Sequence, residues 1–548
     1  MIRKLKFLNY YTMVFLLKTR QGSSFLSVMG LFCIMSLVLL PDIHPFISSY
    51  PSEDESFFHR AAPCIPLERS YFLSPGTDEL ITKYMNQCHE LEQVSAKEPC
   101  KSIYEAFTAV CAQEESLINT INRSDYSNTE KNDYTSRLSR FYAIALKVSY
   151  EAKDIPRIYH YMEQSKFLRG PAKSAVSMPM KLEQLQRELL KMKQQYLSYF
   201  EDGDCIYALL VSGTNIVCKK IDFPGYRDTV QHFAALCADR QLLNAQYGSY
   251  AHTANILYQK LFAPMDIQPG SILVSPGEHF IPFDALTIDR EGHDFLLYHF
   301  AISYTHSATG QFRIADRLTI GDNDFLGIAP ECYAPEVALP RLFGAVQSLQ
   351  KIEDCFAAPK ILSRKTASRK AFLESMGNCS VLHIYSHAGL HSAQPILFLH
   401  DNPVYMKDID LTKKKRLQLV FLAGCETAVA GSGDGPDSYS MADRFVYAGI
   451  PSAVATLWQV ENKVVYAVSE SFYRLLKMGV PRNKALQQAK IEFVKQGIKA
   501  NQMPYYWASI VLFGNTGPIT PAPVKQDLLS FAAILNISLC AFSRRFCI

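Results

Sequence analysis

Short runs of apolar residues recur through the second half of the chain, each separated from the next by a longer amphipathic stretch. Five of these runs are short and continuous, and they lie at 271–276, 325–330, 381–386, 417–423 and 452–458. A continuous apolar run of this length is typical of a strand that is buried on both faces of a sheet. Helical patterns lie between them at 339–354, 437–448 and 461–478. The alternation predicts an α/β domain with a mostly parallel sheet.

Two other patterns precede these units. The runs "IYALLVSG" and "NIVCKKIDF" flank a "GTN" turn, so residues 206–223 are expected to form a β-hairpin. Residues 66–200 have a helical pattern instead, and residues 145–170 resemble one tetratricopeptide-type pair of helices separated by "KDIP". One apolar stripe with helical spacing closes this region and consists of Leu182, Leu185, Leu189, Met192 and Tyr196.

Composition limits the class of protein. At 548 residues the chain is too long for one ordinary core, so two or three folded units are expected. A hydrophobic fraction of 48% with 20% charged residues is typical of globular proteins and excludes disorder as the main state. Lys and Arg number 56 against 52 for Asp and Glu, and no long basic run is present, so nucleic acid is not an expected partner. The 14 cysteines are scattered and indicate neither a disulfide scaffold nor zinc knuckles.

The first residues predict a location. An uncharged apolar run at 23–40 follows a basic segment and precedes the acidic "SEDES" at 52–56. This charge asymmetry is typical of a signal peptide or signal anchor, which we assign to residues 1–45; the alternative is a buried hydrophobic helix. The chain is therefore expected to be exported or anchored in the membrane through this segment, with its main domains outside the cytoplasm.

The last residues, 521–548, form a hydrophobic tail. The apolar stretch at 528–542 has 15 residues and is followed by Arg544 and Arg545. As a helix it would be about 22 Å long, shorter than the ~30 Å hydrocarbon core of a bilayer. The tail is either a second membrane anchor or a terminal helix that packs on the domain.

Three histidines at a spacing of four occur in "SVLHIYSHAGLH", residues 380–391. On a helix, His383, His387 and His391 would share one face and could bind a metal. However, "VLHIYS" has the pattern of a buried strand and Gly389 follows it, so we expect neither a continuous helix nor a metal site. His383 is expected inside the sheet, and His391 and His400 in loops or at the surface. His387 is expected at the carboxyl end of its strand, where reactive groups of parallel sheets lie.

A cysteine occupies the same kind of position in "LQLVFLAGCETA", residues 417–428. Cys425 is the first functional group after the strand and the small Ala423-Gly424 pair. It lies 425 − 387 = 38 residues after His387, which is enough for a loop and one crossover, so the two residues can end neighbouring strands. A thiol beside an imidazole can be activated, because the thiolate is the nucleophile and an imidazolium lowers the thiol pKa.

Several linked segments resemble a known family. In order and spacing, they are similar to CHAT domains, the caspase-like and separase-like cysteine peptidase relatives often found behind tetratricopeptide repeats. The segments are "HIYSHAG", "LVFLAGCETAVAG", "GDGPDSYSMADRFVYAGIPSAVATLWQVEN" and "PYYWASIVLFGN", with "ILVSPGEHFIPFDAL" and "YHYMEQSKFLRG" upstream. The resemblance implies an α/β caspase-like domain at 201–520, preceded by a helical, tetratricopeptide-like region at 66–200.

The resemblance also implies roles for individual residues. Cys425 would attack the scissile carbonyl, and His387 would hold the thiolate form and protonate the leaving amine. The backbone N–H groups of Ala388 and Cys425 would form the oxyanion hole. Ala388 replaces the glycine that usually follows the histidine; it still supplies an N–H, and Gly389 is the next residue that can adopt a positive φ without cost.

Acidic residues follow the cysteine where the family builds its substrate pocket. Glu426, Asp434, Asp437 and Asp443 could form a pocket that favours a basic P1 side chain. Alternatively, Asp437 is a helix N-cap and Asp434 lies in a solvated turn. The glycines of "GSGDG" lack the Lys and Ser/Thr of a phosphate-binding loop, so a nucleotide cofactor is not expected.

The sequence thus predicts a cysteine endopeptidase that acts on a protein or peptide substrate without a cofactor. Its helical region would bind a regulatory protein. The alternative is a catalytically inactive scaffold, in which the helices bind a partner and the caspase-like domain is a structural platform, because a fold does not guarantee an activity.

Overall fold

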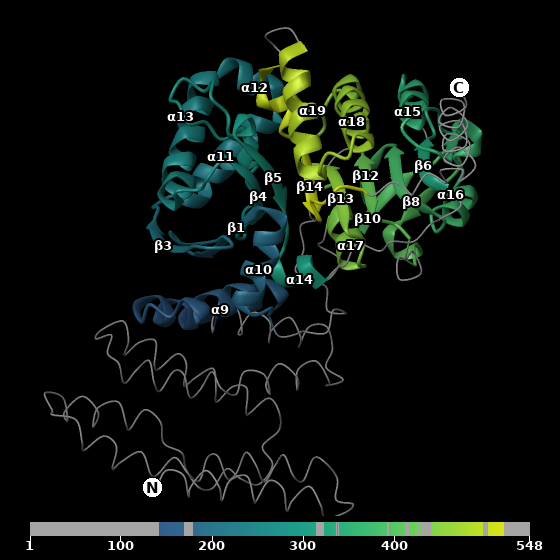
Figure 1. Cartoon of the computed structure of the whole chain (residues 1–548). Helices are drawn as coiled ribbons and strands as arrows, with labels where there is room; N and C mark the ends of the chain where they lie inside the picture. The colour runs from purple at the N-terminus through teal and green to yellow at the C-terminus, as the bar shows by residue number, and fades with distance from the viewer. Residues whose placement is uncertain are drawn as a thin grey trace, which may run out of the picture. The chain divides into compact units, whose positions relative to one another are not determined.

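The computed structural model describes residues 142–168, 179–313, 323–335, 337, 339–391, 394–410, 416–424, 427–428, 440–496 and 502–519 (Figure 1). All of them belong to the second of two compact units, Tyr104–Ile548. The segment at 1–45, the helical region before residue 142 and the tail at 521–548 lie outside the described residues. Among the helices that the structure describes, none has both the length and the apolar character needed to cross a bilayer.

One large sheet organises the part of the chain that the structure describes. Its eleven strands, in spatial order, are β3 (Ile216–Asp222), β2 (Cys205–Val211), β1 (Gln194–Asp202), β4 (Gly270–Ser275), β5 (Phe300–Tyr304), β14 (Ile510–Gly514), β13 (Ser452–Thr456), β12 (Leu419–Ala423), β8 (Cys379–Tyr385), β6 (Asn323–Ala329) and β7 (Pro359–Ser363). A second, three-stranded sheet has the order β11 (Pro403–Tyr405), β10 (Gln394–Phe398) and β9 (Ala388–His391).

The large sheet is mostly parallel, as predicted. Only the β1–β2, β2–β3 and β13–β14 pairings within it are antiparallel. The five apolar runs of the sequence correspond to β4, β6, β8, β12 and β13, and the predicted hairpin is β2 with β3. Because β14 runs antiparallel to β13, the strands β1, β4, β5 and β14 point one way and β13, β12, β8, β6 and β7 point the other.

The parallel strands β5 and β14 have the shortest backbone pairing in the large sheet. Phe513 and Tyr304 form the one residue pair recorded between these strands, whereas β13 and β14 pair over five residues. Side chains strengthen the junction, because the ring of Phe513 lies 6.0 Å from the ring of Tyr304 and 6.0 Å from the ring of Phe280. The contact between β5 and β14 therefore depends mainly on side-chain packing.

Helices flank the sheet (Figure 1). Those with labels in the described residues are α9 (Ile155–Leu168), α10 (Leu182–Met192), α11 (Tyr226–Ala238), α12 (Arg240–Ala245), α13 (Tyr247–Leu257), α14 (Ala308–Arg313), α15 (Ala345–Glu353), α16 (Arg369–Ser375), α17 (Met441–Tyr447), α18 (Asn462–Lys477), α19 (Arg482–Gln496) and α20 (Pro504–Trp507). Short 3₁₀ or π turns occur at 258–262, 263–265, 283–285, 296–298, 364–366 and 406–408. Helix α18 packs between α15 and α19, and α11 packs on α13.

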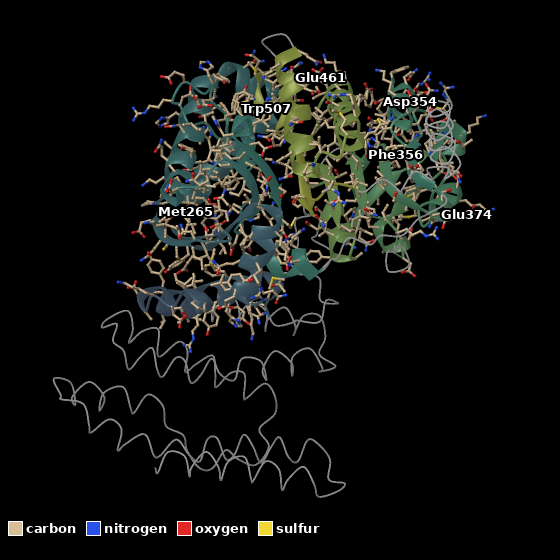
Figure 2. All side chains as sticks on the ribbon, viewed as in Figure 1. Met265, Asp354, Phe356, Glu374, Glu461 and Trp507 are labelled. Carbon is tan, nitrogen blue, oxygen red and sulfur yellow. The ribbon has the colours of Figure 1, made fainter. Side chains whose placement is uncertain are left out.

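Aromatic side chains fill the space between helices and sheet. Trp507 is fully buried and meets Phe295 edge-on at 5.1 Å (Figure 2). Phe356 stacks on the fully buried Phe325 of β6 at 4.5 Å. Burial of each such side chain contributes about 1.5–3 kcal/mol, so the strands that carry the candidate site rest on a well-packed core.

The predicted helix pair is confirmed in its described part. Residues 142–151 are helical, a turn follows at 152–154, and α9 begins at Ile155. Glu163 of α9 is fully buried and accepts hydrogen bonds from the Tyr196 hydroxyl of β1 at 2.6 Å and the Thr309 N–H of α14 at 3.0 Å. Helix α9 is therefore attached to the sheet by a buried carboxylate with satisfied hydrogen bonds.

The apolar stripe that was expected to reach Tyr196 ends earlier. Helix α10 stops at Met192, Lys193 adopts the left-handed conformation with φ 50°, and β1 starts at Gln194. Tyr196 pairs with Val211 across β1 and β2. The aromatic residues after Lys193 favour a strand, and pairing on both sides of β1 outweighs the helical spacing. The sheet thus includes residues before 200, where the helical region was predicted to end.

Candidate active site

Strands β8 and β12 bring the two candidate stretches to one edge of the sheet. They are parallel neighbours whose register runs from Val381 opposite Leu419 to Tyr385 opposite Ala423. His387 follows Tyr385 by two residues, and Gly424 directly follows Ala423. The expectation that these stretches end neighbouring parallel strands is confirmed. Four of the predicted site residues lie outside the described residues: Cys425, Glu426, Asp434 and Asp437.

His387 is held by the loop that follows β6. Its ring nitrogen Nε2 lies 3.0 Å from the Pro340 carbonyl oxygen, and its backbone N–H donates to the Tyr333 hydroxyl at 3.2 Å. A carbonyl only accepts hydrogen bonds, so this contact assigns the proton of the neutral ring to Nε2. Nδ1 is then the basic nitrogen of His387, and the ring of Tyr333, 5.4 Å away, limits its rotation.

The chain after His387 enters β9 in an extended conformation. Phe398 N–H donates to the His387 carbonyl at 3.0 Å, and Ala388 pairs with Leu397. Because N–H groups alternate in direction along a strand, the Ala388 N–H points away from β10. Neither Ala388 nor Gly389 has a positive φ. Alanine therefore fits at 388 without backbone strain, and the expectation that Gly389 would supply a positive φ is wrong.

Gly424 allows the ends of β8 and β12 to lie close together. A Cβ built at Gly424 would lie 2.8 Å from the Ser386 carbonyl oxygen and 3.0 Å from Ala388 Cβ. These residues flank His387 on both sides. Only glycine allows the backbone that precedes Cys425 to lie this near the backbone that carries His387.

The chain is fixed again at Thr427, just after Glu426. Thr427 is buried, and its Oγ1 donates to the Leu422 carbonyl at 3.1 Å and accepts from the Thr456 N–H at 3.1 Å. Ala428 N–H donates to the Thr456 carbonyl at 2.9 Å. The two-residue link Cys425-Glu426 therefore joins two positions, Gly424 and Thr427, that the sheet holds in place.

Asp443 has structural partners. With Ser440 it forms a capping box at the start of α17, each side chain bonding the other residue's N–H at 3.1 Å. Its Oδ1 lies 2.6 Å from Nε2 of His306. Burial opposes ionisation of this carboxyl, but the charge of His306 and the hydrogen bonds outweigh burial and lower the pKa of Asp443. Ser440 is thus the N-cap of α17, a role for which Asp437 was the candidate in one of the two sequence-based interpretations.

The remaining histidines are separated. His383 is fully buried in β8, as expected, with Nδ1 3.0 Å from the Tyr473 hydroxyl, and burial lowers its pKa to about 3. His391 belongs to β9 of the small sheet, and His400 lies in a loop where Nδ1 is 2.9 Å from the Cys332 carbonyl. A helix through His383, His387 and His391 is excluded. No cluster of three or more potential metal ligands occurs in the part of the chain described.

Tyr333 and Pro340 were not anticipated from the sequence. They lie in the irregular stretch between β6 and α15: Tyr333 precedes the helical pattern predicted at 339–354, and Pro340 falls inside that range although α15 begins only at Ala345. The available signal was indirect. Because β6 neighbours β8 in parallel, the loop after β6 must emerge beside the loop that contains His387.

Comparison with known proteins gives one family match. Residues 251–515 match the model of the CHAT domain. No curated protein matches the chain.

Three solved structures show similarity to the chain at 10% identity. Two are separase–securin complexes of Saccharomyces cerevisiae: the 2.6 Å structure has a TM-score of 0.40 and covers 80% of this chain and 37% of that chain. The 3.0 Å structure has a TM-score of 0.48, with 84% and 42% covered. The third is the Arg-specific cysteine proteinase gingipain R, with a TM-score of 0.33 and 49% and 67% covered. The chain thus spans about two fifths of the length of the separase chains it matches.

Proposed function

Residues 251–515 form a CHAT domain, and from this premise we propose that the chain is a cysteine endopeptidase acting through His387 and Cys425. One observation carries the proposal: β8 and β12 are parallel neighbours, and Gly424 lies against the residues that flank His387. Tyr385 and Ala423 are the last paired residues of these strands, and His387 and Cys425 each follow by two positions in the sequence.

The proposed reaction uses the Nδ1 nitrogen of His387. Nδ1 accepts the thiol proton of Cys425, and the thiolate attacks the scissile carbonyl carbon to form a tetrahedral intermediate. The intermediate collapses to a thioester when His387 returns the proton to the leaving amine, and water then hydrolyses the thioester. The Pro340 carbonyl supports this cycle because it keeps the other ring nitrogen protonated and fixes the ring plane.

The negative oxygen of the intermediate needs hydrogen-bond donors. Family resemblance assigns this role to the backbone N–H groups of Ala388 and Cys425. The direction of the Ala388 N–H, away from β10, supports this assignment because the donor is not used in the ladder with that strand.

The substrate, regulator and location complete the proposal. The chain would cleave a protein or peptide, and Glu426, Asp434 and Asp437 remain the acidic residues proposed to select a basic P1 side chain. The helical region would bind a regulatory protein; the buried attachment of α9 through Glu163 supports a connection to the peptidase domain. The apolar run at 23–40 would carry the domains out of the cytoplasm.

A labelling experiment tests the peptidase proposal. Wild type, His387→Ala and His232→Ala are treated with iodoacetamide, and the rate at Cys425 is followed by mass spectrometry. His232 is the control because it bonds Ser249 on an exposed surface. We expect Cys425 to outpace the other exposed thiols, and His387→Ala to slow it by about tenfold or more because the thiolate loses its partner. His232→Ala should match wild type.

Peptide hydrolysis and substrate capture extend the test. Panels with basic, acidic and apolar P1 residues are incubated with wild type and Cys425→Ala, and proteins cleaved only by wild type are identified. Equal labelling rates with and without His387, together with no hydrolysis in any panel, would favour the inactive scaffold instead.

A further inference from the structure

His306 and Asp443 join the end of β5 to the start of α17, although they lie 137 positions apart in the sequence. His306 Nε2 is 2.6 Å from Asp443 Oδ1. The carboxylate side chain of Asp443 is 10% exposed and the imidazole of His306 is 38% exposed, so the carboxylate is nearly buried. Hydrogen bonds with charged partners in such surroundings are among the stronger ones in proteins.

The histidine is fixed on two other sides. Its ring stacks on Tyr447, with centroids 4.8 Å apart and an interplanar angle of 26°. Its carbonyl oxygen accepts from the Ser275 hydroxyl at 2.6 Å, which attaches it to the end of β4. His306 therefore presents Nε2 to Asp443 from a rigid position.

The aspartate fixes the first turn of α17. Its capping box with Ser440 orders the residue that starts the helix. Two residues after Ser440, the N–H of Ala442 donates a hydrogen bond to the Thr427 carbonyl at 3.1 Å. Thr427 follows Cys425 by two residues. Only this short link separates the turn that Asp443 holds from the proposed nucleophile.

We propose that the His306–Asp443 pair positions the segment that carries Cys425. The inference rests on the proposed peptidase function. His306 acts as a positioning residue through α17 and Thr427, and we assign it no direct part in the reaction. Without His306, the buried Asp443 carboxylate would lose its hydrogen-bond partner at Oδ1, and the first turn of α17 would shift toward water. A displacement of about 1 Å at a nucleophile can cost about 10²-fold in rate.

The test compares three single variants of the full chain. His306→Ala removes the contact, whereas His306→Gln keeps an N–H donor near the place of Nε2. His299→Ala is the matched control, because His299 precedes β5 and bonds Asp294 in the same way, Nε2 to Oδ1 at 2.7 Å, at an exposed site. Iodoacetamide labelling of Cys425, kcat and KM, and thermal midpoints are measured for each.

His306→Ala should lower both the labelling rate and kcat by about tenfold while KM changes by less than about twofold. His306→Gln should recover most of both rates, and His299→Ala should equal wild type. Unchanged labelling in a folded His306→Ala variant would overturn the inference. Equal losses in His306→Ala and His306→Gln, accompanied by lower thermal midpoints, would also overturn it, because they would indicate a general requirement for folding.

Hydrogen exchange separates this inference from the peptidase proposal. If Cys425 in wild type reacts no faster than other exposed thiols, the peptidase proposal fails. Exchange at residues 424–428 then decides the positioning role alone: faster exchange in His306→Ala than in His299→Ala supports it, and equal exchange refutes it.

Discussion

Gly424 lies so close to the carbonyl oxygen of Ser386 that a Cβ atom at position 424 would be only 2.8 Å from that oxygen. The contact joins the ends of β12 and β8 where their pairing stops. Backbone atoms form both sides of this contact, so neither can rotate away as a flexible side chain would. The spacing of the two strand ends at the candidate site is therefore set by the absence of a side chain at 424.

Gly424→Ala should destabilise the fold and impair the site. The added methyl group meets backbone, so we expect a loss of about 1–3 kcal/mol in the free energy of unfolding, as for overpacked cores. Urea denaturation measures the loss. Gly248→Ala is the control, because a Cβ there meets nothing within 4 Å and the residue lies in α13 without a positive φ. It should stabilise by about 0.5–1 kcal/mol. Equal stabilities of Gly424→Ala and wild type would contradict crowding of a side chain at position 424.

Tyr333→Phe should lower activity while leaving the fold intact. The hydroxyl accepts the His387 N–H, so its removal loosens the backbone that carries the imidazole. Loss of one such hydrogen bond costs about 0.5–1.5 kcal/mol, which corresponds to a decrease of about threefold to tenfold in kcat/KM. Tyr298→Phe, on a tyrosine 37% exposed, is the control and should leave kcat/KM unchanged. An unaffected Tyr333→Phe enzyme would show that this bond is dispensable.

His383 should make the fold sensitive to acid. Its pKa is about 3 in the folded chain because burial disfavours the imidazolium, against about 6.5 for an unperturbed histidine. Between these values the unfolded chain binds a proton that the folded chain does not. Stability is therefore fully present above about pH 6.5 and falls with decreasing pH, by up to roughly 1.4 kcal/mol per unit.

The variant His383→Phe tests this pH dependence. The free energy of unfolding of His383→Phe should depend less steeply on pH between about 6.5 and 3 than that of wild type, whatever its value at neutral pH. Thermal or urea unfolding at several pH values measures the slope. His232→Phe, at an exposed histidine, should keep the wild-type slope. Identical slopes for wild type and His383→Phe would exclude His383 as the source.

Asp284 and Lys490 form a buried ion pair whose side chains are 8% and 1% exposed. Asp284→Ala leaves the Lys490 ammonium without its partner, and we expect a loss of about 3–5 kcal/mol in the free energy of unfolding. Glu188→Ala breaks the exposed pair with Lys191 and should change stability by less than about 1 kcal/mol. Urea denaturation of both variants gives the comparison. Similar effects of the two substitutions would argue against a desolvated charge at Lys490.

The sequence predicted the strands whose patterns are continuous and apolar. β13 illustrates this, because all of its residues from Ser452 to Thr456 are buried and no helical spacing competes. β1 was missed, because its Tyr196 continues the helical spacing of α10. Pairing of β1 with β2 and β4 is a long-range interaction that a local pattern does not contain.

The same limit applies to the candidate site. His387 could be placed at a strand end because the apolar run before it stops there. Its contacts with Pro340 and Tyr333 come from an irregular loop, and Asp443 meets a histidine that follows a different strand. Such contacts depend on the order of strands in the sheet, which the sequence left open. The acidic residues after Cys425 suggested one pocket, whereas the structure uses Asp443 to cap a helix and bind His306.

The junction between β5 and β14 has a mechanical consequence. A single residue pair, Phe513 with Tyr304, represents the backbone ladder at this point, while every neighbouring ladder pairs over three residues or more. A force that pulls β5 away from β14 would meet less resistance from backbone hydrogen bonds than at the neighbouring ladders, so separation there would expose the rings of Tyr304 and Phe513 first. The order of strands in the sheet is continuous. Under tension, however, the sheet would divide between β5 and β14, where side-chain packing contributes more than backbone pairing.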